Sequence, residues 1–147
     1  MLALGIIALL ASIYFLRKKK IIPDSKPDEV ISKLSPLDEA LQSLDALQKS
    51  PAQTSPELKL FYTRLNEILK KYIQRKTGAS QVAKTNAELI YQLQQKQWQK
   101  DEVLQLAQSL RLADVVKFAK YIPAANETES AVDSIRKSIQ SLDKFLS

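Results

Sequence analysis

The stretch SPELKLFYTRLNEILKKYIQRKTG, Ser55 to Gly78, decides the fold of this chain. Plotted at about 100° per residue, its large apolar side chains fall on one arc of a helix, and polar side chains fill the rest. Ser55, Pro56 and Glu57 are a typical helix start, and Gly78 is a typical stop. This pattern predicts a long amphipathic helix that buries one face. The arc consists of Leu58, Phe61, Tyr62, Leu65, Ile68, Leu69, Tyr72 and Ile73.

The helical period returns in four other segments, which span residues 35–51, 85–97, 100–123 and 126–147. None of these segments alternates with the period of two that marks a strand. The chain also has only two glycines, whereas a sheet protein needs many in its turns. The sequence therefore predicts an all-α fold, with a compact helical bundle of about five helices joined by short connections.

Capping residues predict where these segments begin and end. A side-chain oxygen before the first turn satisfies free backbone N–H groups, and a proline cannot continue a helix. The predicted caps and stops are Ser35, Pro51, Thr85 with Glu88, Pro123, and Asn126 with Glu129. The apolar positions predicted to face the core are Leu37, Ala40, Leu41, Leu44 and Leu47 in the first segment and Val132, Ile135, Ile139, Leu142 and Leu146 in the last.

The N-terminus predicts a membrane anchor. MLALGIIALLASIYFL, Met1 to Leu16, is uncharged, and the basic cluster Arg17, Lys18, Lys19 and Lys20 follows it. A secretory signal has its positive charge before the apolar run, so this order indicates one transmembrane helix with a stop-transfer end. Everything after the cluster is then cytoplasmic. We expect an anchor over residues 1–20, a proline-containing tether over 21–35 and a cytoplasmic helical bundle over 36–147.

The composition argues against an enzyme. The 147 residues include no Cys and no His, which removes thiolate chemistry, the commonest general base and the commonest metal ligands. Carboxylates, Lys or Tyr could still catalyse, but no second acid or base stands at a recognisable spacing from any of them. We predict no catalytic, cofactor-binding or metal-binding residue and no small-molecule substrate.

The net charge of +6 is unevenly distributed. Residues 55–84 hold seven basic and two acidic residues, and Arg64, Lys71 and Arg75 lie within about 40° of one another on the helix. We expect Glu67 to pair with Lys71 at i+4. These cations form a solvated face, a contact for anionic lipid, or a dock for an acidic partner protein.

Nucleic acid is the weakest candidate for this basic face. Tyr62 and Tyr72 fall on the apolar arc, where they serve a core better than they serve base stacking. The basic residues are also local, not spread across the fold. We therefore predict no nucleic-acid partner.

The stretch RLADVVKFAKYIP, Arg111 to Pro123, is apolar almost all round its helix, which predicts a central helix with Phe118 buried. Its charges recur every three residues and wind around the surface. Two interpretations of Asp114 stay open: a surface pair with Arg111 or Lys117, or a partly buried pair with a cation of another helix. In either case we expect Asp114 and Lys117 to act in architecture or interaction, not in chemistry.

The order of these features resembles a known family. An apolar span, RKKK, a tether, FYTRLNEILKKYIQRKTG, TNAELIYQL and LRLADVVKFAKYIP follow one another as in the small uncharacterised membrane proteins of MoxR ATPase / von Willebrand A (Bat, aerotolerance-type) operons. The cytoplasmic tail of BatD-type proteins is more loosely similar. The resemblance does not extend to the outer β-rich domain of the fuller family members, and the shared motifs are packing and capping patterns.

The resemblance implies a non-catalytic membrane-anchored accessory or adaptor in the bacterial inner (cytoplasmic) membrane. Its partners would be the lipid bilayer, a MoxR-type AAA+ ATPase and von Willebrand A proteins, in envelope stress or complex maturation. One alternative is a membrane-bound hydrolase or lytic enzyme that uses carboxylates. A second alternative is a basic-face binder of anionic lipid or nucleic acid.

Overall fold

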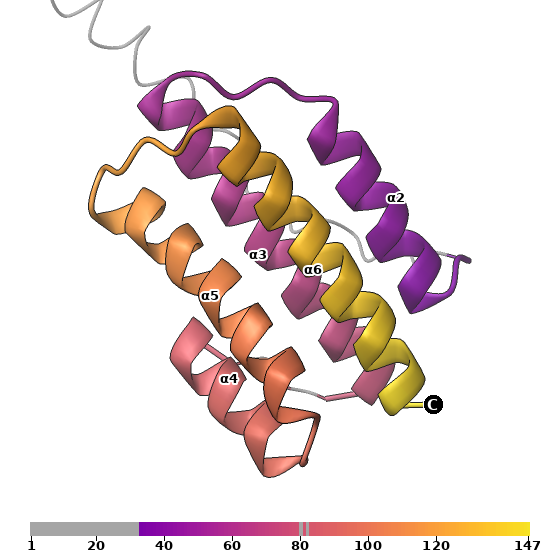
Figure 1. Ribbon diagram of the computed structural model, residues 1–147. Helices are drawn as coiled ribbons and strands as arrows, with labels where there is room; N and C mark the ends of the chain where they lie inside the picture. Colours follow the sequence, from indigo (N-terminus) through magenta and orange to yellow (C-terminus); the bar gives the residue numbers. More distant parts are fainter. Residues whose placement is uncertain (1–32, 80, 82) are drawn as a thin grey trace, which may run out of the picture. The chain divides into compact units, whose positions relative to one another are not determined.

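The fold is known from a computed structural model that describes residues 33–79, 81 and 83–147. The expected anchor, the basic cluster Arg17–Lys20 and most of the expected tether lie outside these residues. The described part contains five helices and no strand, which confirms the all-α prediction (Figure 1). They are α2 (Pro36–Gln48), α3 (Ser55–Thr77), α4 (Asn86–Gln95), α5 (Lys100–Phe118) and α6 (Ala125–Phe145).

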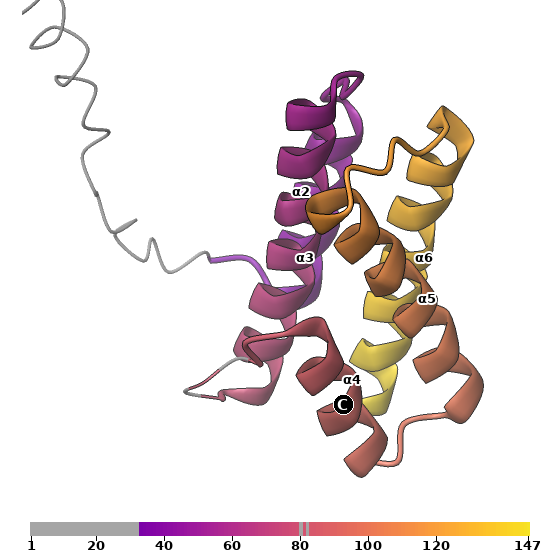
Figure 2. The same cartoon turned by 90° about the vertical axis from the view of Figure 1, so that its left-hand side faces the viewer.

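Side-chain bonds between helices show how the bundle is arranged. Tyr62 near the start of α3 bonds Thr128 near the start of α6, and Tyr72 near the end of α3 bonds Asp143 near the end of α6, so these helices are parallel. The helices α2 and α5 run in the opposite direction. The helix α2 packs against α3 and α6, whereas α5 packs against α3, α4 and α6 (Figures 1 and 2).

The core confirms most of the predicted apolar positions. In α3 the whole predicted arc is buried except Ile68, which is partly buried and packs against the core. In α2 and α6 most of the predicted positions are buried, while Leu37, Leu41 and Leu146 are partly buried. Trp98, between α4 and α5, is also buried, at 4% exposed. Among the described helices, none is long and apolar enough to cross a bilayer.

The capping residue of α3 is Thr54, not Ser55 as predicted. The Thr54 hydroxyl accepts from the Glu57 backbone N–H, and the Glu57 carboxylate accepts from the N–H groups of Thr54 and Gln53. These backbone hydrogen bonds hold the pKa of Glu57 below its usual value. Ser55 and Pro56 therefore occupy the first turn, where proline loses no hydrogen bond. The predicted stop is confirmed, since Gly78 has a φ of 65°.

The predicted end of α5 is wrong. The helix ends at Phe118, five residues before Pro123, and Lys120 has a φ of 54°, which side-chain-bearing residues rarely adopt. The predicted burial of Phe118 is also wrong, because this side chain is 76% exposed. The helix α5 still packs against three helices, but Leu104 and Val115 also face solvent. The bundle thus covers only part of the apolar surface of α5.

The start of α6 also differs from the prediction. The helix begins at Ala125, and the Glu127 carboxylate accepts from the Ala124 backbone N–H at 2.7 Å. Asn126 and Glu129 lie inside the first turns and are exposed. Ala124 has no side-chain oxygen, so the capping signal in the sequence points to Asn126 and not to the observed start.

Candidate interaction site

The cations predicted to form a basic face on α3 are partly neutralised. Lys71 Nζ lies 2.7 Å from Glu39 Oε1, and Arg75 forms an ion pair with Glu39 Oε2. Arg75 also donates to the Leu34 carbonyl at 3.0 Å. Burial raises the pKa of Glu39, but the hydrogen bonds and charges of Lys71 and Arg75 outweigh it and hold the pKa below its usual value. Two of the three predicted cations therefore join α2 to α3.

Arg64, the third predicted cation, is exposed beside a shallow groove between α2 and α3 of about 410 Å³. The same groove includes Glu67 and Lys71. The expected pair between Glu67 and Lys71 does not form in the described structure, because Lys71 bonds Glu39 instead. The predicted basic face of α3 thus contains both basic and acidic side chains.

Asp114 follows neither predicted interpretation. Its Oδ1 accepts from Asn86 Nδ2 of α4 at 2.8 Å, and within the described residues it forms no ion pair. Asn86 Oδ1 in turn accepts from Asn66 of α3 over a long 3.5 Å. Asn66 is 4% exposed, and its Oδ1 has no partner in the described structure. Asp114 is therefore a partly buried link from α5 through α4 toward α3, with a neutral partner.

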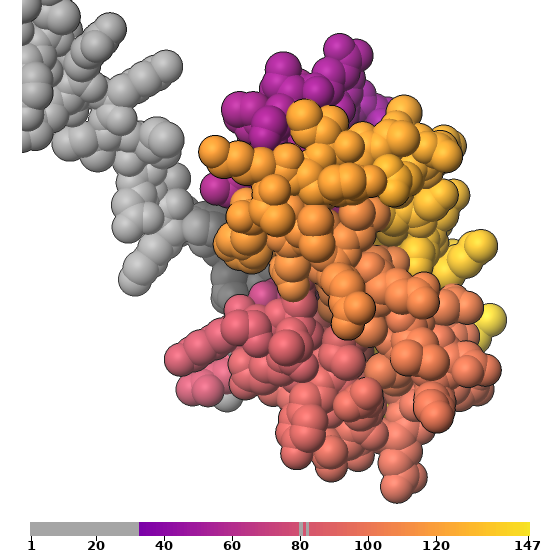
Figure 3. Space-filling model, turned by 60° about the vertical axis from the view of Figure 1, so that its left-hand side comes forward, coloured from indigo at the N-terminus to yellow at the C-terminus, as the bar shows by residue number. Residues whose placement is uncertain are grey.

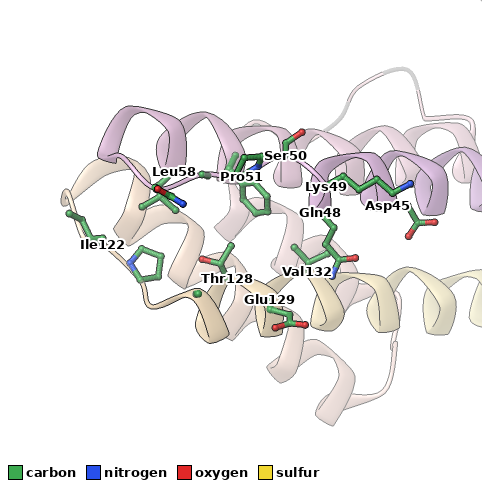
Figure 4. Close-up of a pocket in the computed structure, with 15 residues that line it drawn as sticks. Asp45, Gln48, Lys49, Ser50, Pro51, Leu58, Ile122, Thr128, Glu129 and Val132 are labelled. Atoms are coloured by element: carbon green, nitrogen blue, oxygen red, sulfur yellow. The ribbon is translucent and has the colours of Figure 1, made fainter.

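The described part contains a cleft of about 750 Å³ (Figure 4). It lies between the C-terminal end of α2, the connection 49–53, the start of α3, the connection before α6 and the first turns of α6. The lining residues with the least exposure are Leu58, Phe61, Pro123 and Val132, so the floor is apolar. The exposed lining residues form its rim: Asp45, Gln48, Lys49, Ser50, Pro51, Gln53, Ile122, Ala125 and Glu129.

Bonds between the helices hold the cleft walls in place. Arg136 of α6 forms an ion pair with Asp45 at 2.9 Å and donates to Gln48 at 2.9 Å, which fixes the end of α2. Under the α6 wall, the Tyr62 hydroxyl donates to Thr128 at 3.2 Å. Burial raises the pKa of the Tyr62 hydroxyl, so it stays neutral. The cleft is therefore preformed between braced elements.

An exposed apolar surface adjoins the cleft where α5 ends. We call it the α5 tip and define it as Lys117, Phe118, Lys120, Tyr121 and Ile122. Phe118 is 76% and Ile122 is 60% exposed, and Ile122 also lines the cleft. Lys117 Nζ lies 5.0 Å from the centre of the Phe118 ring. In Figure 3 the orange atoms, which include the end of α5 and the connection after it, lie at the surface.

The sequence pattern predicts neither the cleft nor the α5 tip, and the reason can be identified. Its apolar period runs on from α5 into residues 119–122, so these residues read as helix and core. The positive φ of Lys120 turns the chain instead, and a lysine in the sequence does not indicate such a conformation. The only local hint is Pro123, which marks a boundary.

In the described part, no group of three or more His, Cys, Asp or Glu side chains could hold a metal ion. Two carboxylates described above, Glu39 and Asp114, hold ion pairs or hydrogen bonds within the bundle. Comparison of the chain with protein-family models, curated proteins and solved structures gives no match.

Proposed function

We propose that this protein is a single-pass, membrane-anchored, non-catalytic adaptor that holds a segment of a partner protein in the cleft. The carrying observation is the cleft itself, which has an apolar floor, a polar rim and braced walls. Interaction sites commonly combine an apolar centre with a polar edge. A small polar substrate would instead need convergent polar groups on the floor.

The sequence supplies the proposed setting and partners. The uncharged run 1–16 followed by Arg17–Lys20 supports a place in the bacterial inner membrane with the C-terminal domain in the cytoplasm. The resemblance to the MoxR / von Willebrand A operon proteins supports a MoxR-type AAA+ ATPase or a von Willebrand A protein as the partner. Work in envelope stress or complex maturation belongs to the same proposal.

The alternatives receive less support from the geometry. A hydrolase would need carboxylates free to transfer protons, whereas Glu39 is bound by two cations. A binder that used the basic face of α3 would need Lys71 and Arg75, whose charges meet Glu39. The cleft therefore favours an adaptor over both.

Two matched variants, each with a tryptophan in place of an alanine, test the adaptor proposal. Ala125→Trp fills the cleft from an exposed rim position in the first turn of α6. Ala87→Trp is its control, in the first turn of α4 and outside the cleft. With the full chain in membranes, the MoxR-type ATPase and the von Willebrand A proteins of the same genome are tested for crosslinked binding.

We expect Ala125→Trp to weaken binding about tenfold or more, a loss of about 1.4 kcal/mol, and Ala87→Trp to leave it unchanged. Both variants should melt within a few degrees of the wild type. Equal binding by both variants, or no binding by the wild type, would contradict the proposal.

A further inference from the structure

The α5 tip combines apolar exposure with positive charge. Its three apolar side chains, Phe118, Tyr121 and Ile122, are 76%, 41% and 60% exposed. Lys117 and Lys120 stand among them, and no acidic residue occurs between positions 115 and 126. Of the nearest acids in sequence, Asp114 accepts from Asn86, and Glu127 accepts from the Ala124 N–H and, at 3.0 Å, from the hydroxyl of Tyr121 in the tip. The tip therefore presents Phe118 and Ile122 beside two lysines, and the Glu127 carboxylate borders it at Tyr121.

The backbone maintains this exposure at a cost. Lys120 has a φ of 54°, a conformation that is unfavourable for lysine and easy for glycine. The turn at Lys120 ends α5 and places Tyr121 and Ile122 at the surface. A positive φ just after a helix is a common way to end one, and Gln97 follows α4 in the same conformation, with a φ of 61°. Phe118, Lys120 and Ile122 are all exposed, so the turn holds these side chains at the surface.

We propose that the α5 tip is a membrane-contacting element that inserts Phe118 and Ile122 into the interface of an anionic bilayer. The side chains project from a helix end and a turn, and they do not line a groove of their own. Apolar and aromatic side chains flanked by lysines suit the boundary between headgroups and acyl chains. Lys117 and Lys120 would meet lipid phosphates, each contributing about fivefold to the affinity for anionic lipid.

This inference goes beyond the adaptor function but shares its membrane setting. Because Ile122 belongs both to the tip and to the cleft rim, a partner segment in the cleft would lie close to the bilayer. The tip would thus orient the cleft toward partners that are themselves at the membrane. The contact differs from the predicted basic face of α3, since it uses none of its cations.

The test places a tryptophan at the tip of the full chain, reconstituted in vesicles. Phe118→Trp is compared with Tyr91→Trp, which replaces another exposed aromatic, 61% exposed, on α4. The single native tryptophan, Trp98, is buried and supplies the background. The vesicles contain phosphatidylcholine with or without phosphatidylserine, and quenching by brominated lipid is compared with quenching by aqueous iodide.

In phosphatidylserine vesicles we expect brominated lipid to quench the new indole of Phe118→Trp, and only iodide to quench that of Tyr91→Trp. Adding Lys117→Gln and Lys120→Gln to Phe118→Trp should raise the phosphatidylserine content needed for half-maximal quenching. Adding Lys96→Gln and Lys100→Gln removes the same charge at exposed positions elsewhere and should not raise it.

Two results would overturn the proposal. One is quenching of the Phe118→Trp indole by iodide alone. The other is protection of that indole from iodide only when the partner protein is added, because the tip would then contact protein and not lipid.

Extraction with alkaline carbonate separates this proposal from the membrane anchor. A Phe118→Trp chain that resists extraction, but whose indole at position 118 is not quenched by brominated lipid, keeps its anchor and overturns the tip contact. A chain that is extracted, yet shows lipid quenching at position 118, overturns the anchor and keeps the tip contact.

Discussion

At the scale of single residues, several of the polar side chains that the sequence marks as candidates join helices. Glu39 binds two cations of α3, Arg136 binds Asp45 and Gln48, and Asp114 binds Asn86. Burial raises the pKa of the Tyr72 hydroxyl, and its hydrogen bond to Asp143 raises it further. The sequence marks some of these side chains as candidates for function, and the structure uses them as connections.

The Glu39 connection predicts a loss of stability in acid. The folded pKa of Glu39 is below its unfolded value of about 4.3, so the unfolded state binds more protons between the two values. Stability from this group is complete above the unfolded pKa and falls as the pH drops through the folded pKa. The urea midpoints of wild type and Glu39→Gln are therefore compared at pH 7 and at pH 3. We expect the difference between the two proteins to be smaller at pH 3. An equal gap at both pH values would contradict this.

Asp114 yields a prediction that distinguishes a neutral partner from a charged one. In Asp114→Asn the amide oxygen can still accept from Asn86, so we expect a cost of about 1 kcal/mol. Asp114→Ala leaves the Asn86 amide, which is 8% exposed, without that acceptor and should cost about 1–3 kcal/mol. Urea denaturation of both variants checks the order. A cost above about 3 kcal/mol for Asp114→Asn would indicate a buried cationic partner.

At the scale of elements, α5 differs most from its prediction. The helix is apolar on most of its surface, yet one side is buried against three helices and its C-terminal end is open. A helix that is apolar all round usually lies inside a protein. Here part of the excess apolar surface lies at the α5 tip, where exposure has a proposed use, and part lies outside it at Leu104 and Val115.

A pair of truncations on α5 measures this difference. Leu106 is fully buried, so Leu106→Ala should cost about 2–5 kcal/mol. Phe118→Ala removes a larger side chain from an exposed position and should change stability by no more than about 0.5 kcal/mol. Thermal or urea denaturation of the two variants, with the wild type beside them, decides. A loss of several kcal/mol for Phe118→Ala would mean that Phe118 is buried.

At the scale of the whole molecule, residues Lys33–Ser147 form one compact unit with a continuous core. Its two candidate surfaces, the cleft and the α5 tip, meet at Ile122. An adaptor needs such a preformed domain and a defined side of the membrane. The side is still a prediction from the charge order at the N-terminus.

A reporter fusion tests the predicted side. A reporter that is active only in the cytoplasm, fused after Ser147, should be active, because Arg17–Lys20 follow the apolar run. A reporter that is active only outside the cytoplasmic membrane should be silent at the same position. The opposite pattern would contradict the membrane orientation on which the adaptor proposal depends.

The sequence alone determined the fold class, the five helical segments and most of the buried faces of α2, α3 and α6. This information is local, because a helix repeats its apolar residues every three to four positions and the long arc of α3 is visible without any partner. The expected anchor also follows from a local pattern, although its residues lie outside the described structure.

Only the tertiary structure decided what the polar and terminal residues do. Glu39 meets Lys71 and Arg75 because α2 runs antiparallel to α3, and these side chains are more than 30 positions apart in sequence. The cleft combines residues of three helices and two connections, and no local pattern brings these together. The exposure of Phe118 depends on the turn at Lys120, which the sequence reads as more helix. Contacts between distant segments set all of these features, and the local repeat of apolar residues does not predict such contacts.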